Sequence, residues 1–171
     1  MQIRRLIFTI SWECGFPVER TMGANKDFKD FFTILNAESV EYMVVGEFAF
    51  YYYIEPRFTK NLDIWINISM ENAERTWASL TKFGIPLLGT QVIDFTKPEL
   101  GYQIGVQAVR IKMLGGIAGV SFGDAYPRAE SSVYAGVPIR IISKQDLITS
   151  KKATCRKQDL LDAEQLEDSG Q

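Results

Sequence analysis

The distribution of apolar residues along the chain predicts an alternation of helices and strands. Between positions 26 and 38, apolar residues recur at i, i+3, i+4 and i+7, the spacing of a helix with one face in the core. The residues of this face are Phe28, Phe31, Phe32 and Leu35. The apolar run at 42–45 predicts a short buried strand, and Gly46 permits a tight turn from it into an aromatic helix.

Polar and apolar residues alternate at positions 61–67, which predicts a second strand. Side chains on a strand point alternately to its two faces. One face carries Leu62, Ile64 and Ile66, and the other carries Asn61, Asp63, Trp65 and Asn67. We expect the first set to face the core, which leaves the acid on the opposite face.

The same two patterns continue into the second half of the chain. A helix begins after the N-cap residue Ser69 and ends near Gly84. Positions 85–107 are rich in glycine and weakly periodic, and we expect a loop with a short helix or strand. Alternation returns at 108–114, which predicts another strand.

The last part of the sequence predicts a hairpin and a helix. Roughly, positions 129–135 pair with positions 137–142 around Gly136. Ser143 and Asp146 then resemble the capping box of a charged C-terminal helix. We expect both hairpin strands to extend the sheet.

The composition favours one globular domain and excludes several classes of enzyme. Nearly half of the 171 residues are apolar, including 11 Phe and 7 Tyr, which is enough for one core. The sequence has no histidine, so Ser-His-Asp and Cys-His nucleophiles and His-ligated zinc are excluded. The formal charge of −2 argues against a dedicated nucleic-acid coat. Cys14 and Cys155 have no ligand spacing, and we expect reduced thiols in a cytoplasmic protein.

The first 22 residues are interpreted separately. Arg4 and Arg5 before an apolar run resemble the start of a signal peptide, but the run stops at Glu13 and no convincing cleavage site follows. We therefore expect an N-terminal extension at 1–22, a single domain at 23–171 and no association with a membrane.

Two motifs, in this order, resemble one known family. A glycine turn at Gly46 after a buried strand is followed by R-x-T-x-N-x-D, formed by Arg57, Thr59, Asn61 and Asp63. Near the C-terminus the chain resembles K-x-A-x-x-R-x-x-D, formed by Lys151 or Lys152 with Ala153, Arg156 and Asp159. The combination resembles the minimal nucleotidyltransferases, most closely their abortive-infection and toxin-type group.

The resemblance implies an α+β fold of two layers, a mixed β-sheet with helices packed mainly on one face. In that family, two acids of a D-x-D motif and a third acid of a later strand hold two Mg²⁺ or Mn²⁺ ions, which clamp a nucleoside triphosphate. The corresponding positions in this chain are Asn61, Asp63 and Lys112. Three carboxylates thus become one amide, one carboxylate and one ammonium, whose charges cancel.

The orientation of Lys112 determines what this change means. At an effective dielectric near 20, two unit charges about 4 Å apart interact by roughly 4 kcal/mol. An ammonium facing Asp63 opposes a divalent ion by about twice that energy, and we expect Lys112 to pair with Asp63 instead. The two-metal site is then lost or badly weakened. The alternative is an edge-strand lysine that prevents aggregation.

By the same resemblance, a nucleotide would contact the glycine turn, the R-x-T motif and the C-terminal helix. The residues concerned are Gly46, Glu47, Arg57, Thr59, Lys151, Lys152 and Arg156. Glu47 replaces a second glycine of the turn and is either a replacement metal ligand or a solvated acid at a helix N-terminus. Arg57 either neutralises phosphate or pairs with Glu55 or Asp63. The lysines either approach phosphate or belong to a charged helix face.

These observations lead to three hypotheses about function. The first is a nucleotidyltransferase-fold protein with a lost or weakened metal site that still binds nucleotide, RNA or a protein partner. The second is an active Mg²⁺- or Mn²⁺-dependent enzyme that moves a nucleoside monophosphate to an RNA, protein or small hydroxyl acceptor, in a toxin–antitoxin or resistance role. It needs Glu47 or Asp94 beside Asp63. The third is an interaction module that uses an exposed tyrosine among positions 51–53.

Overall fold

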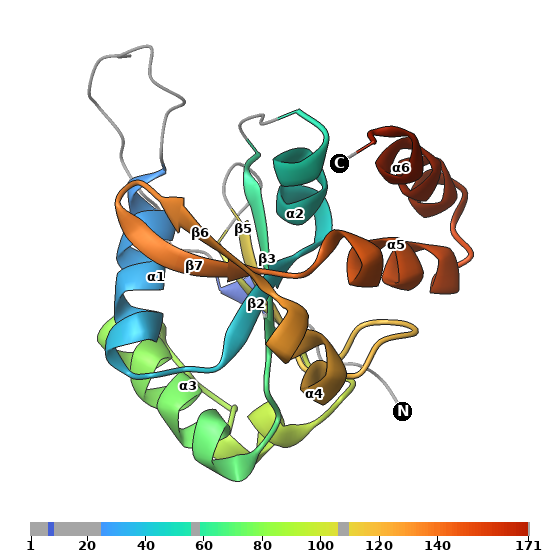
Figure 1. The fold of residues 1–171 in the computed structure, drawn as a ribbon. Coiled ribbons are helices and arrows are strands. Elements are labelled where there is room, and N and C mark those ends of the chain that lie inside the picture. The colour runs from blue at the N-terminus through green and yellow to red at the C-terminus, as the bar shows by residue number, and fades with distance from the viewer. Residues whose placement is uncertain (1–6, 9–24, 56–58, 106–109, 171) are drawn as a thin grey trace.

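A computed structural model describes residues 7–8, 25–55, 59–105 and 110–170. They form a seven-stranded sheet in the order β1-β4-β5-β3-β2-β7-β6 (Figure 1). The strands are β1 (Ile7–Phe8), β2 (Tyr42–Val45), β3 (Asn61–Ile66), β4 (Gly101–Ile104), β5 (Arg110–Leu114), β6 (Glu130–Tyr134) and β7 (Val137–Ile141). The helices are α1 (Lys26–Ala37), α2 (Gly46–Tyr53), α3 (Met70–Lys82), α4 (Phe122–Ala125), α5 (Lys144–Ala153) and α6 (Lys157–Asp168), with short 3-10 helices η1 (Val92–Thr96) and η2 (Tyr126–Arg128).

The sheet mixes parallel and antiparallel pairs, which confirms the predicted α+β class. β3 runs antiparallel to β2 and parallel to β5. β7 runs parallel to β2 and carries β6 at the edge of the sheet. At the other edge β1 pairs with β4, so Ile7 and Phe8 of the predicted extension join the sheet. The rest of positions 1–22 lies outside the described residues.

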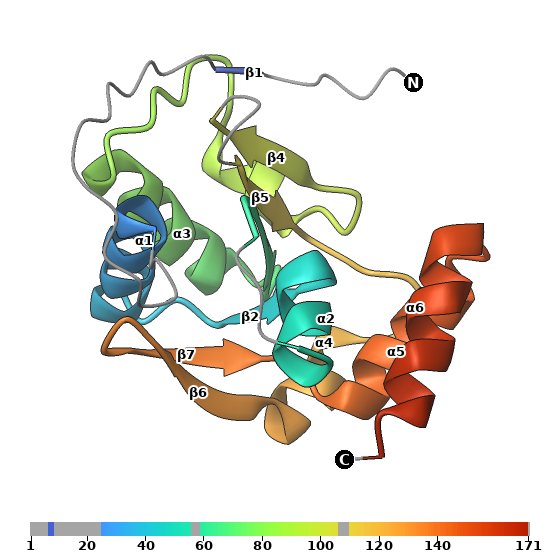
Figure 2. The same cartoon turned by 90° about the horizontal axis from the view of Figure 1, so that it is seen from above.

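The helices form two groups, which Figures 1 and 2 show from two sides. α1 and α3 contact each other on one side of the sheet, and α1 also contacts β7. α2, α5 and α6 contact one another where β2 and β7 end and the chain continues into α2 and α5. The second group therefore carries side chains from three helices to the ends of two central strands.

The helix α1 follows the apolar spacing of its sequence. All four residues of the predicted face are at most 1% exposed, namely Phe28, Phe31, Phe32 and Leu35. Burying each such side chain contributes about 1.5–3 kcal/mol. Asn25 caps the helix because its side chain accepts a hydrogen bond of 2.8 Å from the backbone N–H of Asp27.

The segment at 85–107, expected to contain a short helix or strand, contains both η1 and β4. η1 packs on α3 through an edge-on contact of Phe95 with Trp77, with ring centroids 6.1 Å apart. Asp94 belongs to η1, where it accepts a hydrogen bond from Lys97 at 2.6 Å. The segment thus extends the sheet by one strand and closes the core beneath α3.

The C-terminal region departs from the prediction at one point. The charged stretch expected as one helix is two helices, α5 and α6, separated by a turn in which Cys155 has a φ of 55°. Ser143 caps α5 as predicted, accepting a hydrogen bond of 3.2 Å from the backbone N–H of Asp146. The hairpin of β6 and β7 is confirmed, with Gly136 at a φ of 84° in its turn.

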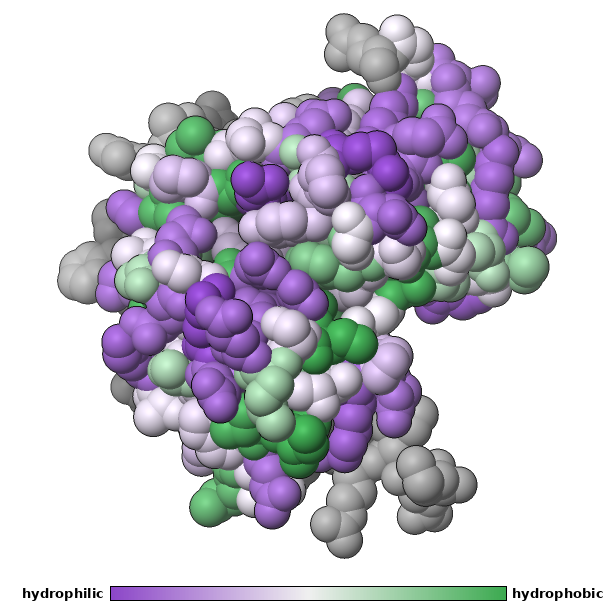
Figure 3. Space-filling view, turned by 60° about the horizontal axis from the view of Figure 1, so that its bottom comes forward, coloured by the Kyte–Doolittle hydropathy of each residue, from purple (hydrophilic) through white to green (hydrophobic). Residues whose placement is uncertain are grey.

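The tyrosines of α2 are each only partly exposed. Tyr53 donates a hydrogen bond of 2.8 Å to the carbonyl of Ile142, and the ring of Tyr52 meets it edge-on. All three are therefore partly buried surface tyrosines and none is fully exposed, because this short helix packs against the chain that follows β7. Figure 3 shows one face of the molecule, where polar residues predominate and apolar residues form small groups. Within the described residues, no helix has the length and apolar character needed to cross a membrane.

Candidate functional site

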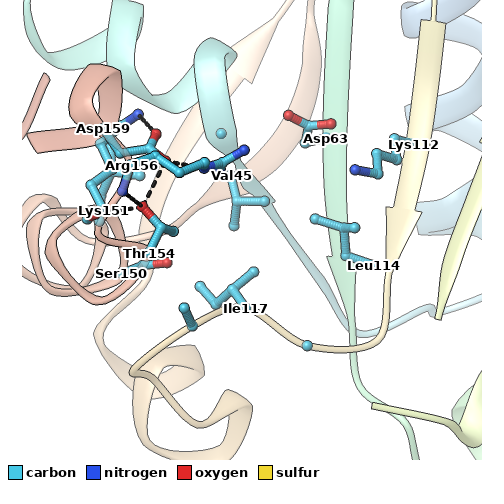
Figure 4. A pocket seen from close by; sticks show the side chains of 14 residues that line it. Val45, Asp63, Lys112, Leu114, Ile117, Ser150, Lys151, Thr154, Arg156 and Asp159 are labelled. Carbon is cyan, nitrogen blue, oxygen red and sulfur yellow. Dashed lines mark hydrogen bonds and ion pairs between the residues drawn. The ribbon is translucent and has the colours of Figure 1, made fainter. Parts of the chain in front are cut away.

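A pocket of about 240 Å³ lies where β2 ends and the chain turns into α2 (Figure 4). Its polar lining comes from β3, β5, α5 and the start of α6: Asp63, Lys112, Ser150, Lys151, Thr154, Arg156 and Asp159. Its apolar lining consists of Val45, Leu114, Ile117, Ala118 and Leu147. The fold therefore brings the two sequence motifs, almost a hundred residues apart, into one pocket.

The turn at Gly46 brings the backbone against the carboxylate of Asp63. Gly46 has a φ of 66°, which favours glycine, and a Cβ atom there would lie 2.2 Å from Oδ2 of Asp63. Position 46 thus needs glycine for two separate reasons, its backbone conformation and the space for a neighbouring carboxylate.

Asp63 and Lys112 occupy directly paired positions of β3 and β5. Paired residues point to the same face of a sheet, and both side chains reach the pocket in Figure 4. β5 lies between β4 and β3, so the alternative of an edge-strand lysine is wrong. Asp63 and Lys112 are both among the described residues, and they do not form the expected ion pair. Lys112 is exposed, whereas Asp63 is only half-exposed.

Burial is the main influence on Asp63, and it raises the pKa of the carboxyl group above its ordinary value. The carboxylate of Glu47 also raises this pKa, while the ammonium groups of Lys112 and Lys151 lower it. The two cations therefore offset only part of the cost of burying the charge. A carboxyl group perturbed in this way within a pocket is typical of functional sites.

The two departures from the family pattern beside Asp63 contact each other. Nδ2 of Asn61 donates a hydrogen bond of 2.9 Å to Oε2 of Glu47. Glu47 lies in the first turn of α2, where the helix dipole favours an acid, yet it is half-buried and hydrogen-bonded, not fully solvated. An aspartate at position 61 would place a second carboxylate against Glu47.

The R-x-T motif is described only in part. Thr59 is buried, and its hydroxyl accepts a hydrogen bond of 3.1 Å from the backbone N–H of Asn61 and donates one of 3.3 Å to the carbonyl of the same residue. Thr59 thus fixes the start of β3 and the position of Asn61. Arg57 lies outside the described residues.

The C-terminal motif contributes two cations to the pocket. Lys151 is only 8% exposed and forms ion pairs with Asp159 at 3.2 Å and Asp162 at 2.7 Å. Its ammonium also lies 5.4 Å from the ring centroid of Phe50. Arg156, whose side chain is 75% exposed, donates a hydrogen bond of 2.6 Å to Asp159. Both cations that line this side are thus held by acids of α6.

Other predicted residues lie away from the pocket lining. Lys152 points elsewhere and pairs with Glu167 at 2.6 Å. Asp94, proposed as a substitute acid, is held in η1 by Lys97 and by the backbone N–H of Gln91. Neither residue is part of the pocket lining.

Sequence reasoning missed part of the pocket. Asp159 was recognised only as a motif residue, although it accepts hydrogen bonds from Lys151, Arg156 and Thr154. The apolar wall around Ile117 was missed altogether. The spacing of the C-terminal motif was a signal for Asp159, but no local pattern reveals which loop residues face a distant strand.

The donor set does not match a site for two divalent ions. Asp63 is the one acid that sequence resemblance assigns to metal and that the pocket retains, and the amide of Asn61 is engaged by Glu47. Lys112 adds a positive charge at the position that pairs with Asp63. Within the described part of the chain, no group of three or more acidic or sulfur side chains is placed to hold a metal ion. The three positive and two negative side chains of the lining instead favour an anion.

Comparison with known proteins identifies the class of fold. No family model and no curated protein matches the sequence. The structure is similar to the antibiotic-resistance factor ANT(2'')-Ia, with a TM-score of 0.50 and 10% identity over 82% of this chain and 80% of that chain. It is also similar to the lincomycin-bound lincosamide antibiotic adenylyltransferase LnuA, with a TM-score of 0.51 and 12% identity over 87% of this chain and 99% of that chain.

These similarities show that the chain has the nucleotidyltransferase fold. The fold predicted from the two motifs is thereby confirmed. At sequence identities of 10% and 12%, the similarity supports an inference about the fold alone.

Proposed function

We propose that this chain is a nucleotidyltransferase-fold protein that binds the phosphates of a nucleotide while its two-metal transfer chemistry is lost or badly weakened. One observation carries the proposal, namely the strand register that sets Lys112 of β5 directly beside Asp63 of β3. A cation supplied by the protein stands where the family's third acid would complete a metal site. The same cation favours a phosphate without a metal ion.

The two walls of the pocket suit the two parts of a nucleotide. Lys112, Lys151 and Arg156 line the polar wall and suit phosphate oxygens. The apolar wall around Leu114 and Ile117 suits the flat surface of a base or of an acceptor. Both cations of the C-terminal motif already contact Asp159, so a phosphate competes with this acid when it binds.

A second candidate function is transfer by an active enzyme. Glu47 supports it, because its carboxylate raises the pKa of Asp63 and so belongs to the same electrostatic environment. In this case a nucleoside monophosphate passes to an RNA, protein or small hydroxyl acceptor, as in toxin–antitoxin or resistance systems. Asp63→Ala should then abolish turnover. If this variant keeps its turnover, the active-enzyme function is excluded.

The further expectations from the sequence belong to the same proposal. They are membership of the abortive-infection and toxin-type group, a cytoplasmic location, an RNA or protein partner, and a single domain at 23–171 preceded by an extension. The lincomycin-bound structure of LnuA raises a small hydroxylated acceptor as an alternative to RNA or protein. A panel of labelled transfer assays with each acceptor class separates them.

Calorimetry with ATP tests the proposal. We expect saturable binding that does not require Mg²⁺ or Mn²⁺, and no labelled product in a transfer assay with either ion. A single variant with Asn61→Asp, Lys112→Asp and Glu47→Gly restores the three family positions, and we expect it to bind Mn²⁺ more tightly than the unaltered protein. Efficient metal-dependent transfer by the unaltered protein would overturn the proposal.

A further inference from the structure

β2 and β7 are joined at one end and separate at the other. They pair through Val44 and Ile141, and the backbone N–H of Ile142 donates a hydrogen bond of 3.0 Å to the carbonyl of Val44. Toward the first residues of both strands the ribbons move apart in Figure 1. Neighbouring strands of a sheet normally stay about 4.8 Å apart, so this separation leaves a gap within the sheet.

A second pocket, of about 420 Å³, lies in this gap. Its lining comes from α1 and the following loop, β2, η2 and the hairpin: Asn36, Val40, Tyr42, Tyr126, Ser131, Ser132, Pro138, Ile139 and Arg140. None of these residues lines the pocket at Asp63. The two pockets therefore lie toward opposite ends of β2, one at Tyr42 and the other at Val45.

A chain of two hydrogen bonds crosses the gap between the two strands. The hydroxyl of Tyr42, a residue only 3% exposed, donates a hydrogen bond of 3.1 Å to Oδ1 of Asn36. Nδ2 of Asn36 in turn donates one of 2.8 Å to the carbonyl of Pro138. This chain fixes both strands to α1 and keeps the pocket walls in place, so the cavity is preformed.

Arg140 supplies the charge of this pocket. Its guanidinium group lies 4.6 Å from the ring centroid of Tyr126, and its Nη1 makes a long contact of 3.5 Å with the carbonyl of the same residue. In the described part of the chain, no acid forms an ion pair with Arg140 and no acid lines the pocket. Most of its five N–H donors are therefore left for a ligand.

Hydroxyl-bearing residues share the lining of this pocket with Arg140. Ser131 is paired directly with Arg140 across the hairpin, and Ser132 follows it in the lining. Burial raises the pKa of Tyr42, and the neighbouring Tyr126 raises it further, while the guanidinium of Arg140 lowers it. The three side chains thus lie near enough to act on one another. A cation with spare donors among neutral hydroxyl donors and without an acid is the arrangement that recognises an oxyanion.

We propose that the pocket between β2 and β7 binds a small molecule carrying a carboxylate or phosphate group, with Arg140 as its charged anchor. The aromatic rings of Tyr42 and Tyr126 enclose the rest of the ligand. The site is separate from the nucleotide pocket and does not depend on the function proposed for it.

Two-dimensional NMR with citrate and inorganic phosphate as probes tests this inference. We expect saturable shifts of the backbone amides of Ser132 and Ile139. The tighter of the two probes identifies the class of oxyanion. Arg140→Gln should weaken its binding by about tenfold or more, the effect of losing a charged hydrogen bond.

The matched control is Lys29→Gln, which removes the same charge from an exposed position of α1 outside the pocket. It should leave the affinity unchanged within about twofold, and the dispersion of the amide spectrum shows that both variants are folded. The inference is overturned if neither probe causes saturable shifts, or if Arg140→Gln binds as tightly as the control.

Discussion

The close approach of Gly46 to Asp63 gives the sharpest test of the site geometry. A methyl group at position 46 meets two obstacles, the left-handed backbone with a φ of 66° and a carboxylate oxygen 2.2 Å away. The first costs about 1–2 kcal/mol, and overpacking typically adds about 1–3 kcal/mol. Gly46→Ala should thus lower the free energy of unfolding by about 2–5 kcal/mol.

The hairpin provides a matched control. Gly136 has a φ of 84°, and nothing lies within 4 Å of the Cβ position. Gly136→Ala should cost only the backbone penalty of about 1–2 kcal/mol. Urea unfolding at pH 7 measures both variants, and the difference between them isolates the contact with Asp63.

A double variant isolates the same contact independently. In an Asp63→Ala background the obstacle at Oδ2 is removed and only Cβ of residue 63, at 3.1 Å, remains close, so Gly46→Ala should cost little more than Gly136→Ala. The two changes are then strongly non-additive, as expected for residues in contact. Equal costs for Gly46→Ala in both backgrounds would refute the inference that the carboxylate lies against the turn.

Two further predictions concern charge. Asp63→Asn should raise the melting temperature at pH 7, because the raised pKa of Asp63 gives stability that is present below the ordinary value of 3.8 and is lost as the pH rises through the folded value. The gain in melting temperature should disappear below about pH 3.8. Equal melting temperatures of the variant and the unaltered protein at pH 7 would contradict this reasoning. Asp159→Asn should tighten ATP binding about tenfold, equivalent to about 1.4 kcal/mol, as measured by calorimetry. The change frees Arg156 and removes one of the two acids paired with Lys151. Glu167→Gln, outside the pocket, is its control, and equal affinities for the two variants count against a competing acid.

The sequence predicted those elements whose pattern is local. α1 has a regular apolar period, and β3 alternates, so both were found with nearly correct bounds. The pairing of Asp63 with Lys112 also followed from alternation, because resemblance supplied the order of the strands. The register fixes which backbone positions are neighbours but not the conformation of a long side chain. The expected ion pair of Lys112 with Asp63 was therefore wrong.

Features that depend on tertiary contacts were not predictable. Cys155 adopts a positive φ without being glycine, so nothing in the local sequence indicates that α5 ends there. Asn61 and Glu47 lie on different elements, and neither strand alternation nor helix period indicates their hydrogen bond. The gap between β2 and β7 likewise follows from how far two strands stay together, which depends on the helices beside them.

The hydrogen bond between Asn61 and Glu47 has a consequence for the order in which mutations are tolerated. If position 61 changes to aspartate first, two carboxylates meet across 2.9 Å, and the intermediate is less stable than either neighbour on the path. If Glu47 changes first, the later step meets no repulsion. Any evolutionary route between an acidic metal cleft and the present pocket is thus constrained by epistasis, and it passes through position 47.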